Sequence, residues 1–210
     1  NGTDRGVIHR GERLGQGIEI VQHPPSTLRL LPSLIFERAF RDPMQTRFRG
    51  RAWTFSDDIS TDHIIAGRYL GTTDPKVFAE HAFEAVDPTW AKKVQVGDLI
   101  VAGDNFGCGS SREQAPIALR TLGISAILAN SFARIFFRNA INLGFPAIEC
   151  PGLRNKVTAG DAIELDLAGG EVHLSSGEVM RFKPIPPNVL EILEAGGLVA
   201  KLKKELAAKP

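Results

Sequence analysis

The chain has 210 residues and a mass of 22.8 kDa, which is the size of one large domain or of one domain with an appendage. Its 25 Lys and Arg balance 24 Asp and Glu, so we expect no nucleic-acid partner and no membrane partner. No stretch approaches the roughly 18 consecutive apolar residues of a membrane span. The two cysteines, Cys108 and Cys150, exclude a disulfide framework and favour a reducing compartment such as the cytoplasm.

Residues 1–50 differ in composition from the rest of the chain. They hold eight Arg and no Lys, and four prolines interrupt any long helix. Their acidic residues argue against an organelle transit peptide. We therefore expect an N-terminal extension of unknown role, in which Leu31–Phe40 is compatible with one short amphipathic helix. The globular domain is expected over residues 51–210.

Two strand–loop–helix units follow one another in the middle of the chain. Short apolar runs alternate there with segments of helical periodicity, which is typical of an α/β domain. A Gly-rich loop follows the first strand, and Gly123 ends the first helix. The predicted elements are a strand at Leu99–Ala102, a helix at Arg112–Leu122, a strand at Ser125–Ala129, a helix at Ser131–Leu143 and a strand at Ala147–Glu149.

Beyond Pro151 the pattern changes to short strands joined by turn residues, which predicts a small β-meander. The chain then continues into two helical pieces interrupted at Gly196-Gly197. The predicted fold class is α/β, with a mixed sheet, flanking helices and a small β-meander. The expected strands are Ala162–Leu167, Glu171–Leu174 and Val179–Phe182; the helical region is Pro187–Leu206, with Leu190, Leu193, Leu198, Val199, Leu202 and Leu206 on its buried side.

The Gly-rich loop from Gly103 to Gly109 leads directly into a predicted helix. Such a loop brings backbone N–H groups close to a ligand, and a helix start carries a partial positive charge, so we predict an anion site. No Lys follows the glycines as in a P-loop, and the third glycine of the dinucleotide fingerprint is missing. A nucleotide phosphate is therefore disfavoured, and a plain strand–helix turn is the alternative.

Ser110 and Ser111 begin two overlapping capping-box patterns, with Glu113 and Gln114 as their partners. We expect one serine to cap the helix and the other hydroxyl to lie at the mouth of the loop beside Arg112. The field at that position favours an oxyanion. The thiol of Cys108 could be acidified in the same loop, but without an obvious base it is a weak candidate nucleophile.

A second polar cluster spans residues 56–63 and combines carboxylates, hydroxyls and a histidine. In the simplest interpretation, aspartates end the preceding strand and Ser60 or Thr61 caps a short helix. The more specific interpretation is that Asp62 and His63 form a polar or ion-paired site facing the Gly-rich loop. The other histidines lack the spacing of a metal triad, so we expect no metal ligands in this chain.

Three motifs in a fixed order carry a resemblance to a known family. The motifs are Asp57-Asp-Ile-Ser-Thr-Asp-His-Ile-Ile65, Gly103-Asp-Asn-Phe-Gly-Cys-Gly-Ser-Ser-Arg-Glu-Gln114 and Asn130-Ser-Phe-Ala-Arg-Ile135. Over residues 50–205 the chain resembles the small subunits of 3-isopropylmalate dehydratase, the separate-chain version of the swivelling C-terminal domain of aconitase. The resemblance implies an aconitase-type swivelling β/β/α domain.

The resemblance also implies roles for the residues of the Gly-rich loop. Ser110 is similar in position to the family's catalytic base, which removes a proton from the substrate. Ser111 and Arg112, with Gly109, would hold a carboxylate of a small dicarboxylate substrate. Asp62 and His63 match the family's Thr-Asp-His segment, which lines the same cleft, and would support acid–base chemistry.

The enzyme of this family moves a hydroxyl between adjacent carbons through an unsaturated intermediate, with a [4Fe–4S] cluster as Lewis acid, in leucine biosynthesis. Such a cluster needs cysteine thiolates, which the two cysteines here cannot supply. The resemblance therefore implies that a separate large subunit holds the cluster. We expect this chain to bind no cofactor itself and to be inactive alone.

In relatives, the loop after Thr-Asp-His-Ile-Ile reaches the variable group of the substrate, and here that loop is Gly67–Thr73. Leu70, Gly71 and Thr72 would contact that group. An arginine within the loop would suit a third carboxylate, whereas this chain has Gly71 and carries Arg68 earlier. An isopropyl or methyl group is favoured. The alternatives are a homoaconitase or citraconate/methylmalate hydratase small subunit, or a non-catalytic anion-binding module.

Overall fold

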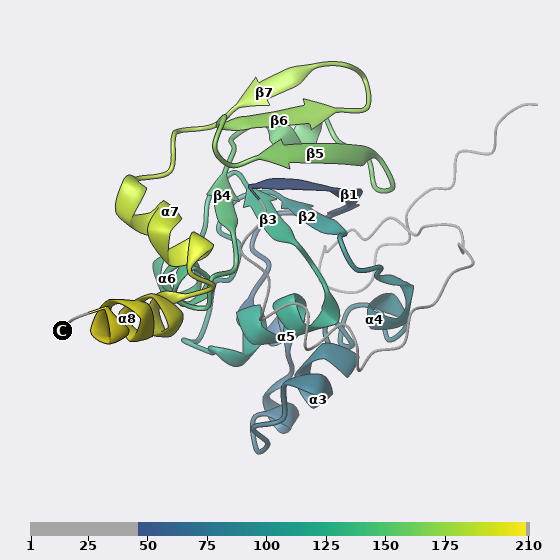
Figure 1. Ribbon diagram of the computed structural model, residues 1–210. Helices are drawn as coiled ribbons and strands as arrows, with labels where there is room; N and C mark the ends of the chain where they lie inside the picture. Colours follow the sequence, from purple (N-terminus) through teal and green to yellow (C-terminus); the bar gives the residue numbers. More distant parts are fainter. Residues whose placement is uncertain (1–45, 209–210) are drawn as a thin grey trace, which may run out of the picture.

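The computed structural model describes residues 46–208. A seven-stranded mixed sheet runs through the domain in the order β4-β3-β2-β1-β5-β6-β7 (Figure 1). The strands are β1 (Arg47–Thr54), β2 (Leu99–Ala102), β3 (Ala126–Ala129), β4 (Ala147–Glu149), β5 (Ala162–Asp166), β6 (Glu171–Leu174) and β7 (Val179–Arg181). The predicted α/β fold with a mixed sheet and a meander is confirmed. The helix expected at Leu31–Phe40 lies outside the described residues.

Strand β1 joins the two halves of the sheet. Its first five residues, from Arg47 to Arg51, pair antiparallel with β5, and its last three pair parallel with β2. Strands β1 to β4 run parallel to one another, whereas β5, β6 and β7 pair antiparallel with their neighbours. The meander is therefore continuous with the parallel half, and residues 47–50, which we had expected in the N-terminal extension, belong to the sheet.

The longer helices follow the strands as expected, with later starts. Helix α5 begins at Gln114, after a local turn in which the Arg112 N–H donates to the Ser110 carbonyl. Helix α6 begins at Arg134, because Phe132 is bridged to Phe106 and Ala133 is extended. Gly123 adopts φ +103° and ends α5 as predicted. Figure 1 shows α3, α4 and α5 at the opposite end of the molecule from the β5–β7 meander. The helices are α2 (Thr61–Ile64), α3 (Pro75–Glu80), α4 (Trp90–Lys93), α5 (Gln114–Leu122), α6 (Arg134–Asn142), α7 (Pro187–Glu194) and α8 (Leu198–Ala207), with 3₁₀ turns η1 (Gly67–Tyr69) and η2 (Leu153–Asn155).

Both faces of the parallel half are buried, which explains why its strands are apolar without alternation. Trp53, Ile100 and Ile127 belong to one apolar cluster with Phe55 and Trp90. Residues of opposite orientation, such as Val101 in β2 and Leu128 in β3, belong to a second cluster that continues under the meander. The alternation along each strand thus sends successive side chains into two separate cores.

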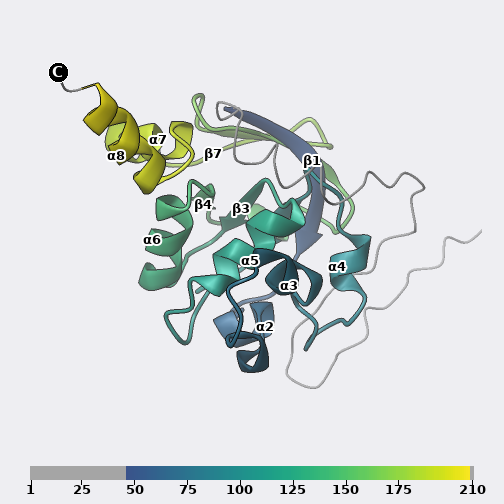
Figure 2. The ribbon, with the colours of Figure 1, turned by 60° about the horizontal axis from the view of Figure 1, so that its bottom comes forward.

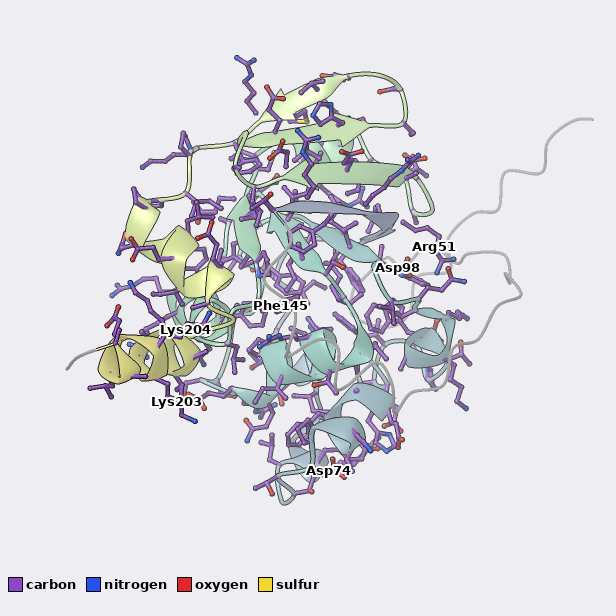
Figure 3. All side chains as sticks on the ribbon, in the orientation of Figure 1. Arg51, Asp74, Asp98, Phe145, Lys203 and Lys204 are labelled. Atoms are coloured by element: carbon purple, nitrogen blue, oxygen red, sulfur yellow. The ribbon has the colours of Figure 1, made fainter. Side chains whose placement is uncertain are left out.

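A buried carboxylate connects β1 to the segment before β2. Arg51 donates to both oxygens of Asp98 (3.1 and 2.8 Å), and the Trp53 indole N–H (2.8 Å) and the Gln95 backbone N–H (2.9 Å) donate to Asp98 Oδ2. Figure 3 labels Arg51 and Asp98, which lie side by side near α4. Several hydrogen bonds therefore offset the cost of burying this charge.

The C-terminal helices only partly match expectation. Leu193 on α7 is fully buried, but Val199, Leu202 and Leu206 on α8 are exposed, so their predicted burial is wrong. Helical spacing identified one apolar face, but within the described residues α8 lies at the periphery and packs mainly against α6 and α7 (Figure 2). Within residues 46–208, no helix has the length and apolar character needed to span a membrane.

Candidate active site

Three loops that leave neighbouring parallel strands lie side by side. They are residues 55–63 after β1, which include the start of α2, 103–112 after β2 and 130–133 after β3, and each holds most of one sequence motif. The Gly107 N–H donates to the Ile59 carbonyl (2.7 Å), and the Phe106 N–H donates to the Ser131 carbonyl (3.0 Å). Since the carboxyl ends of parallel strands share one edge of a sheet, the topology itself brings the motifs together.

Glycine is required at two positions of the central loop for close approach. A Cβ at Gly103 would lie 1.8 Å from Asp57 Oδ1. A Cβ at Gly107, which adopts φ +80°, would lie 2.1 Å from Cγ of Phe136 in α6. The glycine pattern therefore reflects packing between the loops and the helix, in addition to any ligand.

Polar side chains link the three loops. Asp57 Oδ1 accepts from the Asp104 N–H (2.7 Å), and Asp58 Oδ1 accepts from the Asn105 side-chain amide (2.8 Å). Asp104 Oδ1 in turn accepts from the Ser131 hydroxyl (2.9 Å). Asp57 and Asp58, which in the simplest interpretation only end the preceding strand, therefore link the loops to one another through hydrogen bonds.

Ser110 and Ser111 both lie exposed at the mouth of the central loop. The expectation that one of them caps the helix is wrong: the cap residue of α5 is Glu113, without a side-chain capping bond. The chain turns at Gly109 (φ +91°), and the Arg112 N–H donates to the Ser110 carbonyl (2.8 Å), so the helix begins beyond the serines. Two hydroxyls are therefore available at this position.

An ion pair joins Asp62 to Arg112 beside the Gly-rich loop, where we expected a polar or ion-paired site made of Asp62 and His63. Arg112 Nη1 donates to Asp62 Oδ1 on α2 and to the Ile65 carbonyl oxygen (3.3 Å). The Arg112 side chain is only 18% exposed, whereas that of Asp62 is 58% exposed. The guanidinium is thus held in a fixed position with its carboxylate partner facing solvent.

His63 forms a reciprocal capping box with Ser60, which confirms a predicted cap. The His63 backbone N–H donates to Ser60 Oγ (3.2 Å), and the Ser60 N–H donates to His63 Nδ1 (3.0 Å). Burial lowers the pKa of His63 below its usual value, and the charge of Asp62 opposes this only in part. Neutral His63 therefore carries its proton on Nε2, and its catalytic role stays a prediction.

The thiol of Cys108 does not have the environment of an activated nucleophile. Burial, with the nearby charge of Asp58, raises the pKa of Cys108. Its Sγ donates to the Asp58 carbonyl oxygen (3.6 Å). This geometry disfavours the nucleophile interpretation.

The loop expected to face the variable part of the substrate is held by Glu84. Arg68 pairs with Glu84 (2.9 Å), the Tyr69 hydroxyl donates to the same carboxylate, and His81 Nδ1 lies 2.8 Å from it. The rings of Tyr69 and His81 stack with centroids 4.1 Å apart. Arg68 is therefore engaged away from the end of the loop.

At the end of that loop, Leu70 and Thr72 are half-buried and Gly71 is exposed. A Cβ at Gly71 would meet nothing within 4 Å.

Sequence reasoning missed the hydrogen bonds between Glu84 and the loop, and it missed the contact between Thr61 and Ser110. Both join segments distant in the sequence, so no local pattern indicates them.

Comparisons with known proteins identify the family of this chain. The family model of the aconitase C-terminal domain matches residues 54–152. The chain is 55% identical over 163 residues to the 3-isopropylmalate dehydratase small subunit 1 of Methanopyrus kandleri, covering 77% of this chain and 96% of the relative. It is 50% identical over 165 residues to the isopropylmalate/citramalate isomerase small subunit of Methanocaldococcus jannaschii, covering 78% and 98%.

A crystal structure of 3-isopropylmalate dehydratase from Methanocaldococcus jannaschii superposes with a TM-score of 0.73 at 47% identity, covering 77% of this chain and 96% of that chain. The likeness in sequence and in fold extends over nearly the whole length of these proteins. The resemblance drawn from the three motifs is confirmed. The chain belongs to the family of 3-isopropylmalate dehydratase small subunits.

Proposed function

We propose that this chain is the small subunit of a 3-isopropylmalate dehydratase, a hydro-lyase that interconverts 2-isopropylmalate and 3-isopropylmalate in leucine biosynthesis together with a large subunit. The observation that carries the proposal is the meeting of Ser110, Arg112 and Asp62 at one loop cluster. These residues lie in two of the motifs on which the family resemblance rests.

Ser110 is the proposed base. A serine hydroxyl is a poor base in water, so its oxyanion needs nearby donors and positive charge. We assign this role to N–H groups of the loop, the start of α5 and the adjacent Arg112. Because Ser110 is exposed, a substrate held by the large subunit has access to it.

Arg112 is the proposed ligand of a substrate carboxylate. Both of its hydrogen bonds within the described chain use Nη1, and the guanidinium carries five N–H donors in a rigid fork. A carboxylate would bind the remaining donors with the help of Ser111 and the backbone at Gly109. Asp62 would keep the fork in the required orientation.

This chain does not fit the role of cluster holder. An iron–sulfur cluster needs several thiolates, but Cys150 is buried in an apolar core and the pKa of Cys108 is raised. Within the described residues, no three His, Cys, Asp or Glu side chains form a group that could hold a metal. We assign the [4Fe–4S] cluster to the large subunit.

An apolar variable group is the proposed substrate feature at the loop after α2. Gly71 leaves open space, and Arg68 is paired with Glu84 instead of facing a third carboxylate. The Methanocaldococcus jannaschii relative is named for both isopropylmalate and citramalate, whose variable groups are apolar. A homoaconitase small subunit is the second candidate, and a citraconate/methylmalate hydratase subunit is the third.

The first test is anaerobic co-expression with a large subunit, followed by an absorbance assay for the unsaturated intermediate from 3-isopropylmalate, citraconate and homoaconitate. Ser110→Ala is expected to lower kcat by roughly 10³-fold or more, as loss of a catalytic group does. Ser176→Ala, in the turn between β6 and β7, is the matched control and should leave kcat unchanged. Activity of the chain alone, or an active Ser110→Ala enzyme, would contradict the proposal; no activity with a cluster-loaded partner favours the anion-binding module.

The substrate loop is tested separately by Gly71→Arg. The open space at this position allows the side chain without a clash. If the loop selects the substrate, the variant should gain activity on homoaconitate and lose activity on isopropylmalate. A gain without any loss would support the loop as selector and weaken the apolar preference. An unchanged substrate profile would remove the loop from the proposal.

A further inference from the structure

Thr61, the first residue of α2, is a buried polar residue at the centre of the site, with 1% of its surface exposed. Its backbone N–H donates to the Cys108 carbonyl (2.8 Å), and its hydroxyl donates to the Ser110 carbonyl (3.1 Å). These two bonds fix the residues on either side of Gly109. Thr61 therefore holds the turn that carries the proposed base.

The Thr61 hydroxyl also has a second acceptor within reach. Its Oγ1 lies 3.5 Å from Ser110 Oγ, and either atom can be the donor. The Ser110 carbonyl accepts in addition from the Arg112 N–H (2.8 Å), so it keeps a partner when the Thr61 hydroxyl turns away. Because a hydroxyl proton rotates about its C–O bond, no rearrangement of heavy atoms is needed.

We propose that Thr61 is a positioning residue that holds Ser110 in place and donates a hydrogen bond to its anionic form. The inference rests on the proposed role of Ser110 as the base. When Ser110 is neutral, the Thr61 hydroxyl donates to the Ser110 carbonyl. When Ser110 is ionised, the Thr61 hydroxyl donates to Ser110 Oγ instead. The proton stays on Thr61 in both states. A donor that favours the charged form makes the serine easier to ionise.

Other charged and titratable groups surround this pair, namely Asp62 and His63 on α2 and Cys108 and Arg112 on the central loop. A comparison of Thr61→Val with Thr61→Ser keeps all of them. The valine replaces the hydroxyl by a methyl group, whereas the serine keeps the hydroxyl and removes only the methyl group. The contrast between the two variants therefore isolates the hydrogen bond.

The first experiment reads the effect without any enzymatic activity. Ser110→Cys is introduced into the full chain in a Cys108→Ala background, and the rate of thiol alkylation by iodoacetamide is measured against pH. Adding Thr61→Val should slow alkylation at pH 7 by about 10-fold, because fewer thiols are ionised, whereas Thr61→Ser should stay within about twofold. Equal rates for the two variants would overturn the proposal. Circular dichroism checks folding, and Thr61→Ala replaces Thr61→Val if the valine does not fold.

The second experiment uses the enzyme assembled with its large subunit. Thr61→Val should lower kcat roughly 10- to 100-fold with KM within about threefold, and should move the rising limb of the kcat–pH profile to higher pH. Thr61→Ser should retain the wild-type profile. If Thr61→Val slows alkylation but the wild-type assembly is inactive, the proposed function is rejected and the hydrogen bond from Thr61 to Ser110 stands. If the wild-type assembly is active but Thr61→Val changes neither the alkylation rate nor the pH profile, only the inference about Thr61 is rejected.

Discussion

Two arginine–aspartate pairs of this domain lie in opposite environments. The Asp98 side chain beneath β1 is 3% exposed and accepts from Arg51, Trp53 and Gln95. The Asp62 side chain beside the Gly-rich loop is 58% exposed, and its arginine partner is Arg112. The same two residue types therefore hold a strand through a buried carboxylate in one region and hold a largely buried guanidinium beside a solvent-facing carboxylate in the other.

We propose that burial of the carboxylate separates the pair that stabilises the fold from the pair assigned to substrate binding. An exposed ion pair contributes little to stability, whereas removing one member of a buried pair leaves an uncompensated charge. Mutations at Asp98 should therefore change stability, and mutations at the Asp62 pair should change substrate binding.

The largest effect is expected for Asp98→Ala. It removes the acceptor of several donors, so the free energy of unfolding should fall by about 3–5 kcal/mol, measured by equilibrium urea denaturation. Lys156→Ala is the control, since the side chains of Lys156 and its partner Glu178 are 44% and 47% exposed, and the loss of this pair should cost less than about 1 kcal/mol. Similar losses for the two variants would remove the distinction between buried and exposed pairs.

Arg112→Lys should have a large effect on function and little on folding. A lysine keeps the charge but loses the planar fork, so KM for the substrate should rise roughly 10- to 100-fold, the order of one charge-assisted hydrogen bond. Steady-state kinetics of the assembled enzyme and a thermal melt measure the two effects. An unchanged KM would exclude bidentate binding of a carboxylate by Arg112.

Asp62→Asn should have a smaller effect of the same kind. The amide keeps one acceptor for Arg112 but loses the charge, so we expect a rise in KM of a few-fold to about 10-fold and a stability change below about 1 kcal/mol. The two measurements are those used for Arg112→Lys. A stability loss as large as that of Asp98→Ala would show that the exposed pair is structural after all.

The smallest effect concerns the capping box of α2. Because burial lowers the pKa of His63 in the folded state, protons bind the unfolded chain first as the pH falls below about 6.5. Stability should therefore be full above this pH and decline as the pH falls toward the folded pKa. His63→Gln keeps the capping pattern without a titratable ring, so its unfolding curves at pH 7.5 and pH 5.5 should lack this decline. An identical pH dependence in the wild type and the variant would show that His63 is not its source.

Much of the fold could be predicted from periodicity and turn residues. The strands at Leu99–Ala102 and Glu171–Leu174 and the end of a helix at Gly123 are found as expected. Strand β1 was harder to delimit because its first residues alternate with arginines that lie at the surface. The exposed side of α8 could not be predicted, since spacing defines an apolar face but not the surface that covers it.

At the site, the residue types, their order along the chain and the family could be read from the sequence, because motifs are local. The sequence also placed glycines where the loops need them. Tertiary structure alone decided that neither serine caps α5, that Glu84 holds Arg68, and that Thr61 contacts Ser110. Thr61 and Ser110 come from loops that neighbouring parallel strands place side by side, 49 positions apart in the chain. Arg68 and Glu84 are 16 positions apart within one connection. Hydrogen bonds at such separations leave no periodic signal in the sequence.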